Sequence, residues 1–165
     1  MEKYIISDTH FNHENIIKYC NRPFSDINNM NKKIIENWND IVTDEDIIYH
    51  LGDFLLGSKY DLMDIISKLK GHIYLVRGNH DRLPVGAYIE AGIVVLKNPP
   101  IKMDDYKFLL THRPLSNMRI DDDYINLHGH IHNTILSKKY DSNKHINVSC
   151  DVTGFKPLLL KKIKK

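Results

Sequence analysis

Short apolar runs alternate with amphipathic segments along this chain, and this pattern predicts strands that alternate with helices. In the first part of the chain, runs of strand length lie at 4–6, 46–51, 72–76 and 93–96. Between the second and third of these runs, the segment from Ser58 to Gly71 begins with a suitable helix cap and carries apolar residues at helical spacing. A strand, a helix and a strand with short connections indicate a right-handed parallel crossover.

A longer amphipathic segment covers residues 28–42, and its apolar side chains fall on one helical face. We expect Trp38, which belongs to that face, to lie in the core. Later in the chain, residues 101–103 and 106–110 predict a hairpin with its tip at Asp104-Asp105. Further strands are predicted at 124–127, 146–150 and 157–160, the last of them at a sheet edge.

The composition is that of an ordinary globular protein, with 165 residues of which 42% are hydrophobic and 27% charged. We expect a single domain over residues 1–165. The net charge of +2 is too small to indicate nucleic-acid binding by itself. The amino-terminal residues lack the apolar region of a signal peptide, and no stretch is long enough to span a membrane. We therefore expect a cytoplasmic protein with no membrane association.

Ten histidines are the unusual feature of the composition, because histidine is the commonest metal ligand. The two cysteines, Cys20 and Cys150, lie far apart and form no Cys-x-x-Cys pair, which argues against a thiolate zinc site. We expect both cysteines to be free thiols. The positions of the histidines must therefore indicate the chemistry.

Asp53 is the residue around which that chemistry is organised. It follows Gly52 at the end of the buried run 46–51. Two divalent cations about 4 Å apart repel each other strongly, so a dinuclear centre needs a shared anion. A carboxylate at a strand end, preceded by a glycine that permits a tight turn, suits that position. We therefore expect Asp53 to bridge two metal ions.

Four other predicted strands end in polar residues of the same kind. Residues two apart in a strand point the same way, so we expect Asp8 with His10, and His130 with His132, to project together. Ligands of open α/β sheets bind at the carboxyl ends of the strands, so these groups should converge. The full set is Asp8, His10, Asp53, Asn79, His80, His112, His130 and His132. All are oxygen or nitrogen donors, which suit manganese, iron or zinc better than magnesium.

Taken together, these motifs resemble those of the calcineurin-like metallophosphoesterase superfamily. The resemblance rests on Asp8-x-His10, Gly52-Asp53, Gly78-Asn79-His80-Asp81, His112 and Gly129-His130-x-His132, in the family order. The length and the opening Asp-Thr-His-Phe-Asn-His are similar to those of small single-domain bacterial and phage-type members. The resemblance implies an α/β fold, a four-layer α/β/β/α sandwich in which two mixed β-sheets pack face to face with helices outside.

The resemblance also implies a role for each motif residue. One metal would be held by Asp8, His10, Asp53 and His132. The other would be held by Asp53, Asn79, His112 and His130. His80 would protonate the leaving oxygen without binding metal, and Asp81 would orient His80. Two divalent ions are implied, with manganese expected first and iron, zinc or nickel as alternatives.

A metal-dependent phosphodiesterase is the function that this set predicts. A hydroxide that bridges the two metals would attack phosphorus, and His80 would supply a proton to the departing alkoxide. Arg22, Arg113 and His13 are candidates for contacts to the phosphate oxygens, and the guanidinium group in particular matches phosphate geometry. The expected substrate is a phosphate-ester small molecule or a nucleotide.

Several alternatives stay open at this point. A phosphomonoesterase or a nucleotide hydrolase would use the same residues. A non-catalytic interaction module on the same fold is a further alternative, although such proteins tend to lose ligands that this chain keeps. A nuclease would require a basic groove, for which the net charge of +2 gives little support. The sequence does not indicate an oligomeric state.

Overall fold

The computed structural model describes residues 1–163, which fold into short strands and helices. The strands are β1 (Lys3–Ile6), β2 (Ile47–His50), β3 (His72–Val76), β4 (Val94–Leu96), β5 (Ile101–Met103), β6 (Phe108–Thr111), β7 (Ile125–His128), β8 (His145–Asn147) and β9 (Leu158–Leu159). The α-helices are α1 (Glu14–Tyr19), α2 (Ile27–Asn39), α3 (Lys59–Ile66), α4 (Val85–Glu90) and α5 (Cys150–Thr153). Single 3₁₀ turns are η1 (Asn117–Arg119), η2 (Ser142–Lys144) and η3 (Leu160–Lys162).

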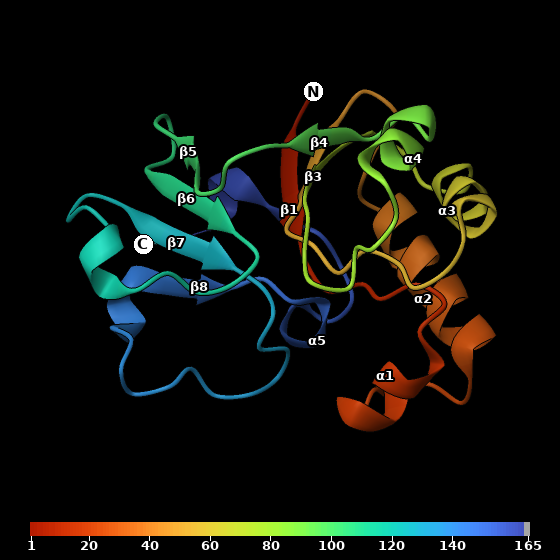
Figure 1. The fold of residues 1–165 in the computed structure, drawn as a ribbon, viewed down its shortest axis with the longest axis horizontal. Helices are drawn as coiled ribbons and strands as arrows, with labels where there is room; N and C mark the ends of the chain where they lie inside the picture. The colour runs from red at the N-terminus through yellow and green to blue at the C-terminus, as the bar shows by residue number, and fades with distance from the viewer. Residues whose placement is uncertain (164–165) are drawn as a thin grey trace.

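The strands form two mixed sheets that share one apolar core (Figure 1). The first sheet has the order β4-β3-β2-β1-β9, in which β9 alone runs antiparallel, at the edge. The second has the order β5-β6-β7-β8, in which β5 and β6 form the predicted antiparallel hairpin. This arrangement confirms the predicted sandwich of two mixed sheets.

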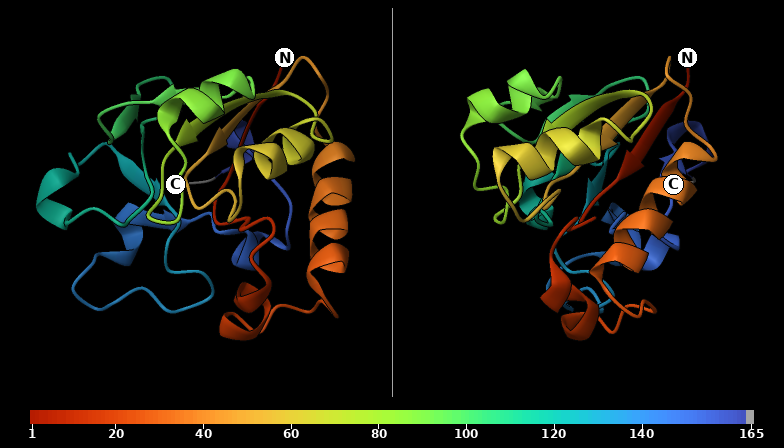
Figure 2. Two further views of the ribbon diagram at one scale, coloured as in Figure 1. Left: turned by 45° about the vertical axis from the view of Figure 1, so that its right-hand side comes forward. Right: turned by 90° about the vertical axis from the view of Figure 1, so that its right-hand side faces the viewer.

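Helices α2, α3 and α4 lie together on the side of the first sheet that faces away from the second sheet (Figures 1 and 2). Helix α2 begins after Asp26, whose side chain accepts a hydrogen bond from the backbone N–H of Asn29. Helix α3 begins with a capping box between Ser58 and Asp61, as the sequence predicts for its start. Trp38 on α2 is completely buried, so the prediction of a core position is confirmed.

Adjacent residues of β1 face opposite sides of the first sheet. Ile6 packs into the cluster under the helices with Trp38, whereas Ile5 packs with Phe108 and Leu127 of the second sheet. Strands that are buried on both faces have continuous apolar sequences rather than sequences in which apolar and polar residues alternate. The outer face of the second sheet is covered by residues 113–124 rather than by α-helices. This segment contains only the 3₁₀ turn η1.

Two short helices differ from the expectations. Residues 146–150 were expected to be a strand, but β8 ends at Asn147 and Cys150 begins α5. Beyond Asn147 the backbone of Val148 and Cys150 hydrogen-bonds to Ser7, which follows β1 of the first sheet. Helix α4 lies in a segment whose sequence gives it no apolar stripe of useful length. No helix among residues 1–163 has the length and apolar character needed to cross a bilayer.

The carboxyl ends of the parallel strands from both sheets meet in one region. Ser7, directly after β1, forms a parallel bridge with Ser149, two residues after the end of β8. The backbone N–H of Ser7 donates to the carbonyl of Val148 at 3.0 Å, and the N–H of Cys150 donates to the carbonyl of Ser7 at 2.8 Å. These bonds bring the loops that follow the two sheets together, as expected for a ligand site in an α/β fold.

Candidate metal centre

The predicted ligands stand on loops that leave the strand ends, and five of them have a left-handed backbone. The angle φ is 59° at Asp8, 51° at His10, 53° at Asp53, 70° at His130 and 50° at His132. Residues with a side chain avoid this region because Cβ crowds the carbonyl, at a cost of about 1 kcal/mol or more for each residue. Such strain persists only where surrounding contacts enforce it, and it is typical of functional sites.

The extended geometry expected from the two-residue spacing is therefore wrong. Strand β1 ends before Asp8, and β7 ends before His130. Asp8 and His10 still belong to one group of side chains, but His130 and His132 belong to two different groups. The side chains converge through tight turns after the strands and not through the alternation of a strand.

Asp8, His10 and His132 form the first group, in which the atoms able to bind a metal all lie within 4.8 Å of one another. The carboxylate of Asp8 is completely buried and accepts hydrogen bonds from the Ser149 hydroxyl at 2.7 Å and from the backbone N–H of His130 at 2.9 Å. One carboxylate and two imidazoles suit a divalent first-row metal.

His132 is oriented from behind by Asp151, a residue that the motifs did not indicate. Nδ1 of His132 donates to Oδ2 of Asp151 at 2.9 Å, which leaves Nε2 for a metal. Burial alone would lower the pKa of His132, but the hydrogen bond to Asp151, the interaction with Cys20 and the charges of Asp8 and Asp151 together outweigh burial and raise this pKa to about 10. A carboxylate that accepts from the far nitrogen of a ligating histidine fixes its ring and raises its basicity.

Asp53, His112 and His130 form the second group, again with all candidate atoms within 4.8 Å. Nδ1 of His112 lies 2.8 Å from the carbonyl of Leu51, which can only accept, so Nδ1 is the donor. In the neutral ring Nε2 then presents a lone pair to Oδ1 of Asn79 at 3.1 Å and to Oδ2 of Asp53 at 3.4 Å. Nε2 of His112, Oδ1 of Asn79 and Oδ2 of Asp53 are then three acceptors that face one another, so they need a proton or a cation between them.

Asp53 lies between the two groups. Its Oδ2 is 3.5 Å from Nε2 of His10 and 3.4 Å from Nε2 of His112. Its Oδ1 accepts a hydrogen bond from the backbone N–H of His80 at 2.7 Å. Burial raises the pKa of the Asp53 carboxyl, but the hydrogen bond and charge of His112 outweigh burial and lower it well below its usual range. Asp53 is therefore an anion that faces both groups.

His10 supplies the test of whether these residues fit a metal. Its Nε2 is buried and has no hydrogen-bond partner among the described residues. Its Nδ1 lies 3.0 Å from Nδ1 of His13. Burial lowers the pKa of His10 to about 2, so the ring is neutral. A buried polar atom without a partner costs about 1–3 kcal/mol, and a cation at this position would remove that cost. The donor set fits two divalent cations.

Two glycines of the motifs permit the close approach of these loops. A Cβ built on Gly78 would lie 2.2 Å from Oδ1 of Asp53. A Cβ built on Gly129 would lie 2.0 Å from the hydroxyl oxygen of Ser7 and 2.2 Å from Oδ2 of Asp8. Any larger residue at either position would push a carboxylate of the centre out of place.

Asp81 does not orient His80, contrary to the expectation. Its carboxylate accepts hydrogen bonds from the backbone N–H groups of Asp53 at 2.8 Å, Phe54 at 2.9 Å and Gly78 at 2.7 Å. Burial raises the pKa of Asp81, although these N–H donors oppose the shift. The residue is almost completely buried behind the centre, where it ties the loop after β2 to the loop after β3.

Arg22 is also placed differently from the expectation, since its guanidinium group is buried and already hydrogen-bonded. Nε and Nη2 donate to the two oxygens of Asp151 at 2.8 and 3.0 Å. Nη1 and Nη2 donate to the backbone carbonyls of Thr9 at 2.9 Å and Asp8 at 2.7 Å. We therefore do not assign Arg22 to the substrate, because it could reach a phosphate only by leaving these buried partners.

His80 and His13 lie in a cavity of about 600 Å³ beside the first group. The centroid of the His80 ring is 5.2 Å from that of His10 and 5.7 Å from that of His13. The cavity also contains the exposed ring of Tyr19 and the free thiol of Cys20. The His80 ring makes no hydrogen bond to another described residue, so its nitrogens can meet a molecule in the cavity.

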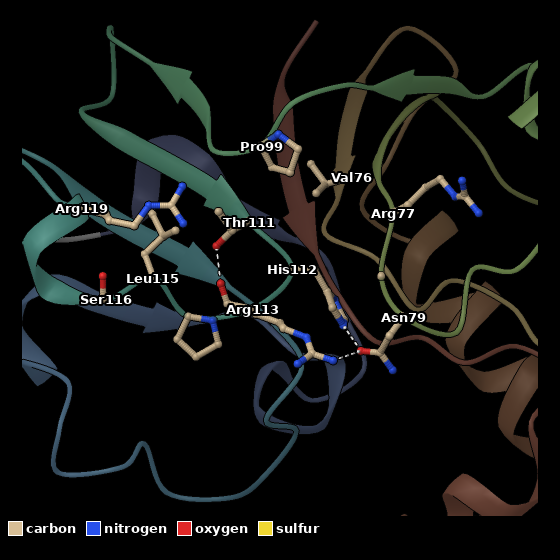
Figure 3. Close-up of a pocket in the computed structure, with 12 residues that line it drawn as sticks. Val76, Arg77, Asn79, Pro99, Thr111, His112, Arg113, Leu115, Ser116 and Arg119 are labelled. Atoms are coloured by element: carbon tan, nitrogen blue, oxygen red, sulfur yellow. Dashed lines mark hydrogen bonds between the residues drawn. The ribbon is translucent and has the colours of Figure 1, made fainter.

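Arg113 lines a second cavity, of about 440 Å³, beside the second group (Figure 3). Asn79 and His112 lie on its edge, and Nη2 of Arg113 is 3.4 Å from Oδ1 of Asn79. The loop that carries Arg113 is held from below by the buried side chain of Asn126, which accepts from the N–H of Leu115 at 2.8 Å. Arg113 is therefore an exposed cation at the edge of the centre.

Comparison with known families gives a match over residues 1–149 to the calcineurin-like phosphoesterase superfamily domain. The chain belongs to the calcineurin-like phosphoesterase superfamily. Membership assigns it to a class of metal-dependent enzymes that act on phosphoesters, and confirms the resemblance found in its motifs.

Individual relatives support the family and the fold. The uncharacterised protein MJ1445 of Methanocaldococcus jannaschii is 42% identical over 167 residues, which cover 98% of this chain and 89% of that protein. The protein of unknown function AQ665 from Aquifex aeolicus superposes with a TM-score of 0.71 at 25% identity, over 98% of this chain and 96% of that one. Nuclease MPE from Pseudomonas putida superposes with a TM-score of 0.53 at 20% identity, over 79% and 61%, which bears on the fold alone.

Sequence reasoning missed the residues that support this calcineurin-like centre from behind. Asp151 and Ser149 lie just after β8, and both contact predicted ligands. A signal for them existed, because they follow an apolar run just as the other polar groups do. The apolar pattern at 146–150 predicts only a strand, and the predicted site does not include the polar groups at its carboxyl end.

Proposed function

We propose that this protein is a phosphodiesterase with a dinuclear metal centre. The observation that carries the proposal is the position of Asp53, whose Oδ2 lies 3.5 Å from a nitrogen of His10 and 3.4 Å from a nitrogen of His112. One carboxylate oxygen therefore faces a candidate ligand from each group, as a bridging ligand must. The buried Nε2 of His10, which has no hydrogen-bond partner within residues 1–163, supports the same proposal.

Seven residues would hold the two cations. Asp8, His10, His132 and Asp53 would bind one, and Asp53, Asn79, His112 and His130 the other. When bound, such a pair of cations lowers the pKa of a water molecule and neutralises charge on phosphoryl oxygens. The mixture of carboxylates and imidazoles is most suitable for manganese, with iron, zinc or nickel as alternatives.

His80 would give a proton to the leaving oxygen. Its backbone N–H is anchored to Asp53, while its ring stands in the cavity beside the first group. A proton donor helps most when the leaving group is a basic alkoxide, and such help is worth roughly 10²–10⁴-fold in rate. This favours a diester with an alkoxide leaving group over an activated ester. His13 and Arg113, in the two cavities, would contact the substrate.

The division of these residues into domains is part of the proposal. We take residues 1–165 as one domain, since Ile5 and Leu51 of the first sheet and Phe108 and Leu127 of the second belong to one buried cluster. A phosphate-ester metabolite or a nucleotide is the proposed substrate class. The proposed location is the cytoplasm.

Hydrolysis of bis-p-nitrophenyl phosphate by the purified chain tests the proposal. We expect activity with added Mn²⁺, loss of activity in excess chelator, and recovery when Mn²⁺ is restored. p-Nitrophenyl phosphate, measured in parallel, separates a diesterase from a monoesterase. Faster hydrolysis of the monoester would favour the phosphomonoesterase. No hydrolysis of either ester with Mn²⁺, Fe²⁺, Zn²⁺ or Ni²⁺ would favour a non-catalytic module.

A nuclease is the second candidate, favoured by the arginines in the cavity beside Asn79 and His112. A structural neighbour described as a nuclease shares the fold at 20% identity. Release of nucleotides from single-stranded DNA or RNA, at a rate that exceeds hydrolysis of simple diesters, would support it. Intact oligonucleotides after hours with Mn²⁺ and active enzyme would exclude it.

A further inference from the structure

We propose that the cavity around Arg113 and Arg119 binds a second phosphate group of the substrate, on the part of the substrate that is retained after cleavage. The inference rests on the proposed phosphodiesterase function and narrows it. Substrates with at least two phosphates, such as phosphorylated dinucleotides or nucleic-acid strands, would then be preferred over single diesters.

The cavity is positively charged and contains no acid. Three arginines line its volume of about 440 Å³, and no Asp or Glu is among the described residues that line it. The cavity between α2 and α3 differs, because its lining includes Glu36, Asp61 and Asp64. A concave surface lined by charge of one sign attracts an oppositely charged group, and a cavity of this volume is large enough for a small ligand.

The three arginines are not equivalent. Arg77 points away from the cavity (Figure 3), and it donates to the backbone carbonyls of Asp81 and Leu83. Arg119 has no side-chain hydrogen bond or ion pair with another described residue, and Arg113 has only the contact at 3.4 Å with Asn79. Two guanidinium groups without an acid partner are therefore available on this wall, and a guanidinium group suits the two-oxygen geometry of phosphate.

The protein holds these two arginines in place from beneath. Arg113 follows β6, and its backbone carbonyl accepts a hydrogen bond from the Thr111 hydroxyl at 2.7 Å. Arg119 lies on the turn η1, which is anchored by the small cluster of Leu109, Leu115, Ile120 and Tyr124. An arginine on an anchored turn loses less freedom on binding than one on a loose loop.

The relation of the two cavities to the centre gives the substrate a direction. His80, the proposed proton donor, lies in the first cavity, so the leaving group belongs on that side. Asn79 and His112 border the second cavity. The other ester group of a diester would therefore enter the second cavity, and a phosphate attached to it would meet Arg113 and Arg119.

Three dinucleotides test the proposal with the Mn²⁺-loaded full chain: thymidylyl-thymidine with no terminal phosphate, with a 5′-phosphate, and with a 3′-phosphate. Analysis of the products shows which nucleoside keeps the new phosphate. We expect a terminal phosphate on that nucleoside to raise kcat/KM about tenfold, mainly through KM, because a charge-assisted hydrogen bond is about twice as strong as a neutral one. A terminal phosphate on the leaving nucleoside should have a much smaller effect.

Arg119→Ala should remove most of the rise in kcat/KM that the terminal phosphate causes, and Arg119→Lys should keep part of that rise. Both variants should hydrolyse bis-p-nitrophenyl phosphate, which has one phosphate, at the wild-type rate. Lys156→Ala is the charge-matched control, because Lys156 is exposed and lines none of the cavities described. The proposal would be overturned if the terminal phosphate raised kcat/KM equally in wild type and Arg119→Ala, or did not raise it in wild type. Neither result would contradict the proposed phosphodiesterase activity.

Binding of the 5′- and 3′-phosphorylated dinucleotides to the metal-free protein, measured by calorimetry, provides a readout that does not depend on turnover. We expect Arg119→Glu to weaken binding of at least one of them by tenfold or more, relative to wild type and Lys156→Ala. If no ester is hydrolysed, this measurement still decides the inference. Binding that is absent in wild type, or unchanged in Arg119→Glu, rejects it.

Discussion

Beneath the metal centre the charged side chains are buried and hydrogen-bonded, whereas around the two cavities the polar side chains are exposed or half-buried and have few partners. We name the first region the floor, which comprises Asp8, Arg22, Asp53, Asp81 and Asp151. We name the second region the rim, which comprises Tyr19, His80, Arg113 and Arg119. Each floor residue makes at least two hydrogen bonds with ligand-bearing loops or with another floor residue. The Tyr19 ring on the rim is 74% exposed.

This contrast indicates that the floor and the rim have different roles. A buried charge must be paired, because an unpaired one costs several kcal/mol, so the floor is fixed by the requirements of folding. The floor residues therefore hold the ligands in strained backbone conformations, and the floor residues themselves cannot easily be substituted. Rim side chains cost little to replace, because water satisfies them when they are free. The rim is where substrate preference can differ between proteins that share the floor.

The largest expected effect is from Asp53→Asn, which removes the proposed bridging anion from the floor. We expect diester hydrolysis to fall by about 10³-fold or more, since a metal pair supplies several kcal/mol to the transition state. Metal content, measured by elemental analysis after dialysis, should fall for both ions. Asp105→Asn, at the exposed hairpin tip, is the control and should retain both. Two bound metals in Asp53→Asn would contradict the bridging role.

On the rim, His80→Ala should act on chemistry without affecting the fold. Cleavage of diesters with alkoxide leaving groups should slow by roughly 10²–10⁴-fold, while bis-p-nitrophenyl phosphate should be affected far less. The melting temperature and metal content should stay close to wild type, because the His80 ring has no hydrogen-bond partner among the described residues. His72→Ala, at the exposed start of β3, is the control. Equal losses on both types of ester would argue against proton donation.

Asp151→Asn tests the support of the floor. The substitution weakens the acceptor for His132, so we expect metal affinity to fall by about 10–100-fold. It also leaves the Arg22 charge buried without its anion, which should cost about 3–5 kcal/mol in the free energy of unfolding. The double variant Arg22→Met/Asp151→Asn should recover part of that stability but not the metal affinity. If Asp151→Asn alone had wild-type stability, the ion pair between Arg22 and Asp151 would not be needed for the stability of the fold.

The smallest expected effect is on the pH dependence of stability. His50 lies beneath the floor, with Nε2 donating to the Thr9 hydroxyl at 3.0 Å and Nδ1 accepting from the N–H of Gly52 at 3.2 Å. Burial lowers the pKa of His50 to about 3, against about 6.5 in an unfolded chain. The unfolded state therefore takes up a proton first, so stability is complete above pH 6.5 and decreases as the pH falls toward 3.

This shift corresponds to a loss of about 2 kcal/mol between pH 7.5 and pH 5. Urea unfolding at the two pH values measures the loss. His50→Gln should be less stable than wild type at pH 7.5 but should lose less on acidification. His72→Gln removes an exposed histidine and should show the wild-type pH dependence. Identical pH dependence in His50→Gln and wild type would mean that His50 carries no such penalty.

The sequence by itself determined most of the strands, the cap of α3 and the order of the motifs. Apolar runs of the correct length predicted β3 over its full extent, and the cap residue Ser58 predicted the start of α3. These features depend on neighbouring residues, so local pattern is sufficient to find them. The candidate ligands were found for the same reason, because each directly follows an apolar run.

Only the tertiary structure decided the partners of the charged residues. Arg22 and Asp151 are 129 positions apart, and no local pattern distinguishes an arginine that meets a buried carboxylate from one that faces a cavity. Asp81 follows His80 in the chain, yet its carboxylate accepts from the backbone of Asp53 and Phe54. The physical reason is that a buried charge must find its partner wherever the packing of the sheets places one, and that packing is a property of the whole chain.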